Sequence, residues 1–257
     1  RSSDLKEKMV VVHTTPFALG VGLENDQMGA IIERNSTTDA DILIDGTVDA
    51  DDPSTQDASL NLDAGDGGNV DVTGAAGGTG ELEGGFTATG ATVDVVSVTT
   101  DSQEAGDDAG AITMTAAAGD VNATGALSAV GNGAGAGGAV DIDATGAVAL
   151  DATVTTDGGA TDADGGDVDV DATGGTVVVA GAISAQGTAD GGNVTIDGSA
   201  GATVDAINSS GGSDANESGG SILLNTGGAA GGTVTLNGDL TAEGTDGGNI
   251  TLGQAGV

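Results

Sequence analysis

A pair of glycines followed by a short alternating segment recurs along most of this chain at a nearly constant spacing. The pairs lie at Gly67-Gly68, Gly137-Gly138, Gly165-Gly166, Gly191-Gly192, Gly219-Gly220 and Gly247-Gly248, with a degenerate copy at Ala109-Gly110. From Gly110 onward the second glycines are 28, 28, 26, 28 and 28 residues apart. A fixed period of this length is typical of architectures in which each repeat stacks on the next. The interval from Gly68 to Gly110 is 42 residues, which indicates either an insertion or an extra half-turn near residues 84–86.

The segment after each glycine pair has the period of a β-strand. In Val140-Asp141-Ile142 and Val168-Asp169-Val170, two apolar residues flank a polar one, as in a strand with one buried face. The equivalent segments in the other repeats are 70–72, 112–114, 194–196, 222–224 and 250–252. Shorter alternating segments follow in most repeats, for example at 177–179 and 182–184. We expect glycines to supply the positive φ angles at the corners between them.

These features predict an all-β fold, a parallel β-helix of about seven to eight rungs formed by residues 41–257. The chain has 257 residues with 50 Gly, two Phe and no Trp, Tyr or Cys, so it cannot build an ordinary core around aromatic side chains. Stacked rungs avoid that need, because they align small side chains in columns. One predicted column contains Val140, Val168, Val194, Ile222 and Ile250. Disorder is the alternative for a chain rich in glycine and charge, but a sustained register argues against it.

The charge of the chain is distributed unevenly. The net charge is −36, and all four basic residues, Arg1, Lys6, Lys8 and Arg34, lie in the first 34 positions. The rest of the chain carries −35 and no Lys or Arg. Nucleic acid and anionic membrane surfaces are therefore excluded as expected partners, because both require clustered basic residues. No apolar stretch is long enough to predict insertion into a membrane.

The glycine-pair segments Gly-Gly-Asn-Val-Thr-Ile (191–196), Gly-Gly-Thr-Val-Thr-Leu (231–236) and Asp-Gly-Gly-Asn-Ile-Thr-Leu (246–252) resemble the repeats of filamentous-haemagglutinin-type exoproteins. The resemblance covers about residues 41–257. It implies a right-handed parallel β-helix in an exported adhesin or matrix rod, located outside the cell or at the cell surface, with no catalytic residues. The start of the chain at Arg1 rather than Met is compatible with processing during export or with a fragment.

The first 40 residues differ in kind and are expected to form a separate N-terminal arm or cap. The motifs at 15–21 and 32–37, within about residues 10–38, resemble the start of the substrate-binding domain of Hsp70 chaperones. The match is short and lacks the remaining parts of a chaperone, so it implies no chaperone activity. From the residues themselves, 18–23 and 28–32 predict a β-hairpin around the polar turn at 24–27. Such an arm is well placed to cap the first rung.

Stacking of the predicted rungs brings acidic residues into ladders on the outer face. Asp143, Asp171 and Asp197 would form one column, continued by Asn225, and Asp141 would lie beside Asp169. Oxygen-rich ladders of this kind suit Ca²⁺, and we expect these five aspartates to be the metal ligands if calcium binds. The alternative is a solvated acidic face screened by ordinary salt. No EF-hand loop or Gly-Gly-x-Gly-x-Asp repeat is present.

The sequence predicts a structural protein rather than an enzyme. His13 is the only histidine, and the repeats offer only Phe86 and no basic residue to grip a sugar beside paired carboxylates. Two classes of function remain open: a subunit that assembles head-to-tail with copies of itself, and a segment of a long adhesin or a cation-binding module that meets a surface receptor. Six Asn-x-Ser/Thr sequons are present, at Asn35, Asn122, Asn193, Asn208, Asn216 and Asn249.

Overall fold

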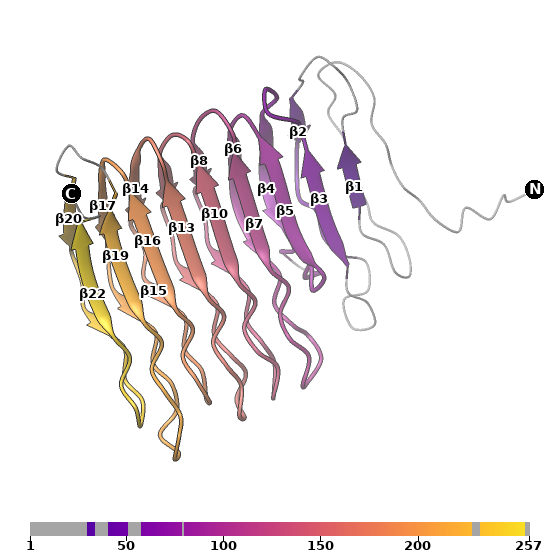
Figure 1. Cartoon of the computed structure of the whole chain (residues 1–257). Coiled ribbons are helices and arrows are strands. Elements are labelled where there is room, and N and C mark those ends of the chain that lie inside the picture. Colours follow the sequence, from indigo (N-terminus) through magenta and orange to yellow (C-terminus); the bar gives the residue numbers. More distant parts are fainter. Residues whose placement is uncertain (1–29, 34–40, 51–57, 79, 228–231, 255–257) are drawn as a thin grey trace, which may run out of the picture.

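The computed structural model describes residues 30–33, 41–50, 58–78, 80–227 and 232–254. In these ranges the chain forms parallel strands stacked as a β-solenoid of about 7 turns, and no helix is present. Figure 1 shows the turns following one another along a single axis, with strands of two sheets facing each other. The all-β parallel solenoid predicted from the sequence is therefore confirmed.

A nine-stranded sheet receives one strand from every turn, and all its described pairings are parallel. Its strands, in spatial order, are β1 (Ala30–Glu33), β3 (Ser59–Asp63), β5 (Gly85–Gly90), β7 (Ile112–Ala116), β10 (Val140–Ala144), β13 (Val168–Ala172), β16 (Val194–Gly198), β19 (Ile222–Thr226) and β22 (Ile250–Gln254).

A thirteen-stranded sheet receives the remaining strands. It begins with β2 (Ile42–Ile44), β4 (Val70–Ala76) and β6 (Val93–Thr99), and β6 then pairs with two shorter strands at once. One branch contains β8 (Val121–Ala123), β11 (Val148–Leu150), β14 (Thr176–Val179), β17 (Gly201–Val204) and β20 (Thr233–Leu236), and the other contains β9 (Leu127–Ser128), β12 (Val154–Thr155), β15 (Ile183–Ser184), β18 (Ile207–Asn208) and β21 (Leu240–Thr241). From β7 to β21 each turn therefore has three strands, and the last described turn contributes β22.

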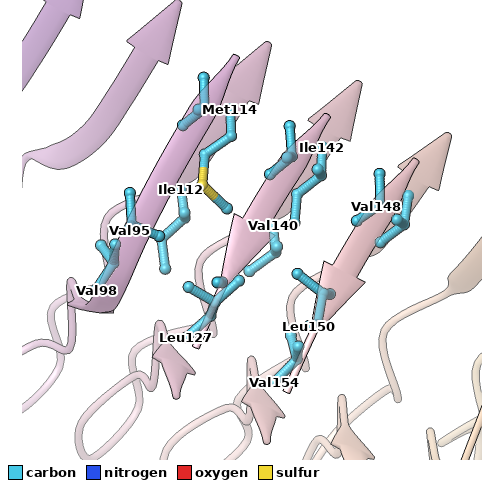
Figure 2. Close-up of a cluster of buried hydrophobic side chains, with 14 of the residues drawn as sticks. Val95, Val98, Ile112, Met114, Leu127, Val140, Ile142, Val148, Leu150 and Val154 are labelled. Atoms are coloured by element: carbon cyan, nitrogen blue, oxygen red, sulfur yellow. The ribbon is translucent and has the colours of Figure 1, made fainter. Parts of the chain in front are cut away.

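The register between turns matches the predicted columns. Val140 lies opposite Val168, and the column continues through Val194 and Ile222 to Ile250. The inner residues of the two sheets face each other between the layers, as the side chains in Figure 2 show. Most of these residues are Val, Ile, Leu or Ala, and Phe86 is fully buried among them. A thin interior filled by small β-branched side chains explains how the chain folds almost without aromatic residues.

One expectation from the sequence is corrected by the structure. Residues 70–72 do not belong to the first-strand column, because Val70 lies opposite Val93 in the thirteen-stranded sheet. Phe86 of β5 takes the position beside Ile112 instead. The reason is that Gly67-Gly68 precedes a strand of the other sheet, in agreement with an extra half-turn in the 42-residue interval.

Positive φ angles do occur at glycines, as expected, at Gly46, Gly65, Gly77, Gly85, Gly106, Gly133 and Gly201, but the glycine pairs that mark the repeat have another role. None of the pairs from Gly137-Gly138 to Gly219-Gly220 has a positive φ. A Cβ on Gly137 would instead overlap the carbonyl of Thr156 in the same turn, and a Cβ on Gly138 would overlap the carbonyl of Gly110 in the preceding turn. Glycine is therefore required because backbones approach too closely for any side chain.

The pairs lie at the necks of loops that project from one edge of the solenoid (Figure 1). At each neck the second glycine donates its N–H to the residue that precedes the loop, as Gly166 does to the carbonyl of Thr156 at 2.6 Å. The preceding residue alternates between a hydroxyl side chain and alanine: Thr100, Ala129, Thr156, Ala185, Ser209 and Ala242. Thr156 Oγ1 donates to the carbonyl of Gly166 at 2.7 Å, and Thr100 and Ser209 make the equivalent bond. The structural repeat thus has a second period of two turns.

The N-terminal arm expected over residues 1–40 falls largely outside the described residues. Its proposed first hairpin strand at 18–23 is not described. Residues 30–33 form β1, which pairs in parallel with β3 at the edge of the nine-stranded sheet.

Candidate functional surface: the acidic outer face and the turn-to-turn carboxylates

The outer face of the nine-stranded sheet brings the five candidate aspartates together as predicted. Asp141 lies opposite Asp169, and Asp143 lies opposite Asp171, which in turn lies opposite Asp197. Alternation along each strand places them outward, since their neighbours Val140, Ile142, Val168 and Val170 are buried. The sheet therefore carries two adjacent acidic columns, one across β10 and β13 and the other across β10, β13 and β16.

The carboxylates in these columns affect one another. Partial burial raises the pKa of Asp169 above its ordinary value, and the facing carboxylate of Asp141 and others around it raise it further. Burial likewise raises the pKa of Asp141, with a contribution from Asp143, and raises that of Asp171, with contributions from Asp197 and Asp143. A similar pair exists on the other sheet, where burial and the charge of Asp94 raise the pKa of Asp71. These directions indicate uncompensated negative charge on the outer face.

The carboxylate at the end of the longer acidic column has hydrogen-bond partners within the protein. Asp197 accepts hydrogen bonds from Asn225 Nδ2 at 3.0 Å and from the backbone N–H of Gly227 at 3.1 Å. Within the described ranges, no group of three His, Cys, Asp or Glu side chains is arranged to hold a metal ion. The arrangement presents rows of negative charge rather than a cage of ligands.

Eight other described aspartates, together with Asp197, have a role that the sequence did not predict. In nine cases an Asp Oδ atom accepts the backbone N–H of a residue one turn later, at distances from 2.7 to 3.1 Å. The aspartates are Asp41, Asp101, Asp108, Asp120, Asp157, Asp164, Asp167, Asp190 and Asp197. Apart from Asp197, they lie at turns and loop necks, where the sheet ladder is interrupted and N–H groups need another acceptor.

These bonds all run in one direction along the solenoid axis. The acceptor is always in the earlier turn and the donor in the later one, and Asn193 continues the pattern by accepting from the N–H of Ser221 at 3.0 Å. Two of these stacked positions continue into the last described turn. Asp246 lies opposite Ser218, and Asn249 is stacked on Ser221. In earlier turns Asp190 and Asn193 occupy these positions and accept an N–H from the following turn. Asp246 and Asn249 therefore place side-chain acceptors where a further turn would supply N–H groups.

The final turn also exposes the core. Ile250 is 46% exposed and Leu252 54% exposed, although Ile222 and Leu224 in the same columns are 1% and 0% exposed. Leu236 of β20 is 38% exposed at the same end. Figure 1 shows β20 and β22 at this end of the molecule.

Fold and surface together define the chain as a highly acidic parallel β-solenoid. None of the protein families, curated proteins or solved structures compared with it matches this chain. No helix in the described part is long and apolar enough to cross a membrane.

Proposed function

We propose that this chain is a structural, non-enzymatic rod that stacks end to end with copies of itself, outside the cell or at its surface. The observation that carries the proposal is the exposure of Ile250 and Leu252 in the last described turn, compared with the buried residues of the same columns. Open strand edges with apolar residues favour pairing with another strand. A heterologous contact of this kind repeats without closing, so its product is a filament.

Three further features support a second copy as the occupant of this surface. Asp246 and Asn249 offer acceptors where a following turn would supply N–H groups. Gly247 has the place of the first glycine in each pair, yet a Cβ there would approach nothing closer than 3.8 Å. In charge, the first 34 residues contain all four basic residues and carry a net charge of only −1, so a body of −35 repels this segment far less than it repels a second body placed side by side.

The experiment is a pair of substitutions measured by light scattering over a range of concentrations with salt present. Leu252→Asp places a charge on the exposed end, and Val178→Asp places the same charge on a side face, where Val178 is 37% exposed. We expect the wild-type chain and Val178→Asp to polymerise and Leu252→Asp to stay monomeric. A wild-type chain that remains monomeric at high concentration would overturn the proposal.

That outcome would favour the second candidate, a segment of a longer adhesin in which further turns cover the final one. The haemagglutinin-like repeat pattern at 191–196 and 246–252 supports this candidate, which also requires a cell-surface or matrix receptor. The Hsp70-like motifs near the N-terminus add no function to either candidate.

Association with Ca²⁺ on the columns of Asp141, Asp143, Asp169, Asp171 and Asp197 is a further proposed property. It is supported by the raised pKa values of Asp141, Asp169 and Asp171, because neighbouring carboxylates that disfavour ionisation are stabilised by a nearby cation.

A further inference from the structure

The structure describes five of the six sequons and separates them by what their asparagine side chains do. Asn122, in β8, donates from Nδ2 to Asp94 at 2.6 Å. Asn193 bonds to Asp167 and to the N–H of Ser221, so it links three turns. Asn208 accepts from the hydroxyl of Ser210 at 2.7 Å and from its N–H at 3.2 Å. A large group on Nδ2 of Asn122 or Asn193 would displace a hydrogen bond between turns. Asn208 is half-buried in β18, between β15 and β21, which leaves little room for a large group. Asn35 lies outside the described residues.

Asn216 differs from these three. It lies at the tip of the loop between β18 and β19, one of the loops that project from the edge of the solenoid in Figure 1, and it is exposed. Its φ is 80°, a left-handed conformation that asparagine tolerates better than most residues. Its side chain makes no hydrogen bond within the described part of the chain, so both amide hydrogens face solvent.

The loop keeps its shape without help from the Asn216 side chain. The N–H of Asp214 donates to Glu217 Oε2 at 2.5 Å, and the N–H of Glu217 donates to the carbonyl of Asp214 at 3.3 Å. Thr245 Oγ1, one turn later, donates to the same carbonyl at 2.6 Å. A group attached to Asn216 would therefore extend into solvent from an ordered turn and would displace none of these bonds.

Asn249 is the other described sequon whose asparagine is exposed and makes no side-chain hydrogen bond. It lies in the last described turn, on the surface that end-to-end stacking would cover. A glycan there would block stacking, whereas one on Asn216 would project from the loop edge in the turn before the last, and not from the surface that stacking would cover.

We propose that Asn216 is the N-glycosylation site of this protein and that Ser218 completes its acceptor sequon. The donor is a lipid-linked oligosaccharide. A bond forms between Asn216 Nδ2 and the anomeric carbon of the first sugar while the bond from that carbon to the phosphate oxygen breaks. The lipid phosphate leaves with the electron pair, and the amide loses one proton. The inference rests on the exported location in the proposed function and not on stacking.

The test is to secrete the full chain from a host with an oligosaccharyltransferase and to map glycosylation by mass spectrometry. The chain has no Lys or Arg after Arg34, so an Asp- or Glu-specific protease must generate the peptides. Enzymatic glycan release in heavy-oxygen water converts each glycosylated asparagine into a labelled aspartate. We expect the label at Asn216, its complete loss in Asn216→Gln and Ser218→Ala, and no change in Asn122→Gln.

Ser218→Thr keeps the sequon and should retain the glycan, which separates loss of the acceptor from loss of the fold. A secreted chain without label at Asn216, or with label only at another sequon, would overturn the inference. Assembly is measured separately on unglycosylated chain from a host that lacks the transferase, so failure of one proposal does not imply failure of the other.

Discussion

At the scale of single residues, the aspartates fall into two groups with opposite effects on stability. Those that accept an N–H from the next turn supply acceptors where the sheet ladder ends, as Asp108 does for Ala136 at 2.7 Å. Those on the outer face of the nine-stranded sheet, such as Asp169, lie beside other carboxylates and repel them. Some of the acidic residues therefore stabilise the fold through hydrogen bonds, and others destabilise it through electrostatic repulsion.

Replacing Asp108 with Ala should destabilise the solenoid by about 0.5–1.5 kcal/mol, because the N–H of Ala136 loses its acceptor. The neighbouring Asp107 is the matched control, since both residues are exposed and the Asp107 carboxylate makes no hydrogen bond in the described structure. Denaturant unfolding of Asp108→Ala and Asp107→Ala compares them. Equal stability of the two variants would show that the turn-to-turn bonds do not contribute.

Replacing Asp169 with Asn should stabilise the protein at pH 7 by about 0.2–1 kcal/mol, since it removes a like charge opposite Asp141. The pKa of Asp169 is raised in the folded state, so the folded protein binds this proton more readily than the unfolded chain. The cost of ionisation is therefore present at neutral pH and disappears as the pH falls through the raised pKa toward the ordinary value of 3.8.

Thermal unfolding from pH 7 to about pH 3.5 measures the difference in stability between Asp169→Asn and the wild-type chain, which should shrink as the pH falls. Asp151→Asn is the control, because Asp151 is exposed and its neighbours in the adjacent turns are Thr124 and Ala180. A stabilisation of Asp169→Asn that stays constant with pH would contradict the electrostatic explanation.

At the scale of the repeat, the glycine pairs set how closely successive turns approach. Replacing Gly219 with Ala should destabilise the fold by about 1–3 kcal/mol or more, because the new Cβ would overlap the carbonyl of Ala242. The same substitution at Gly247 meets no atom closer than 3.8 Å, so the folded monomer should keep its stability. If another copy covers that end, Gly247→Ala should instead weaken assembly. Circular dichroism melting and light scattering separate the two effects.

Much of the fold could be predicted at this scale, because a 28-residue period and a two-residue alternation specify both the stacking and the face that each side chain occupies. The stacked columns that contain Val140 and Asp143 follow directly from these two periods. The role of Gly67-Gly68 could not be predicted, because the glycine pattern does not say which sheet the next strand joins.

The direction of the carboxylate bonds was also beyond the sequence, since it depends on where each Oδ atom points at a turn. The alternation of hydroxyl residues and alanine at successive loop necks, by contrast, can be seen in the sequence. The segment Val-Thr-Thr-Asp occurs at 98–101 and again at 154–157, and in both copies the second Thr closes a loop neck and the Asp accepts from the next turn.

At the scale of the whole molecule, the net charge of −36 should make stability depend on cations. We expect millimolar CaCl₂ to raise the melting temperature more than NaCl of the same ionic strength, because binding adds to screening. The difference should decrease when Asp141, Asp169 and Asp171 are replaced together by Asn. Equal melting temperatures in the two salts would leave only a screened acidic face.

End-to-end stacking is the central claim, and electron microscopy of the full-length chain at high concentration tests it most directly. The account predicts long unbranched filaments in which the strand spacing of ~4.8 Å continues along the axis through every junction between subunits. Isolated rods of about 7 turns, with no longer species at any concentration, would contradict it.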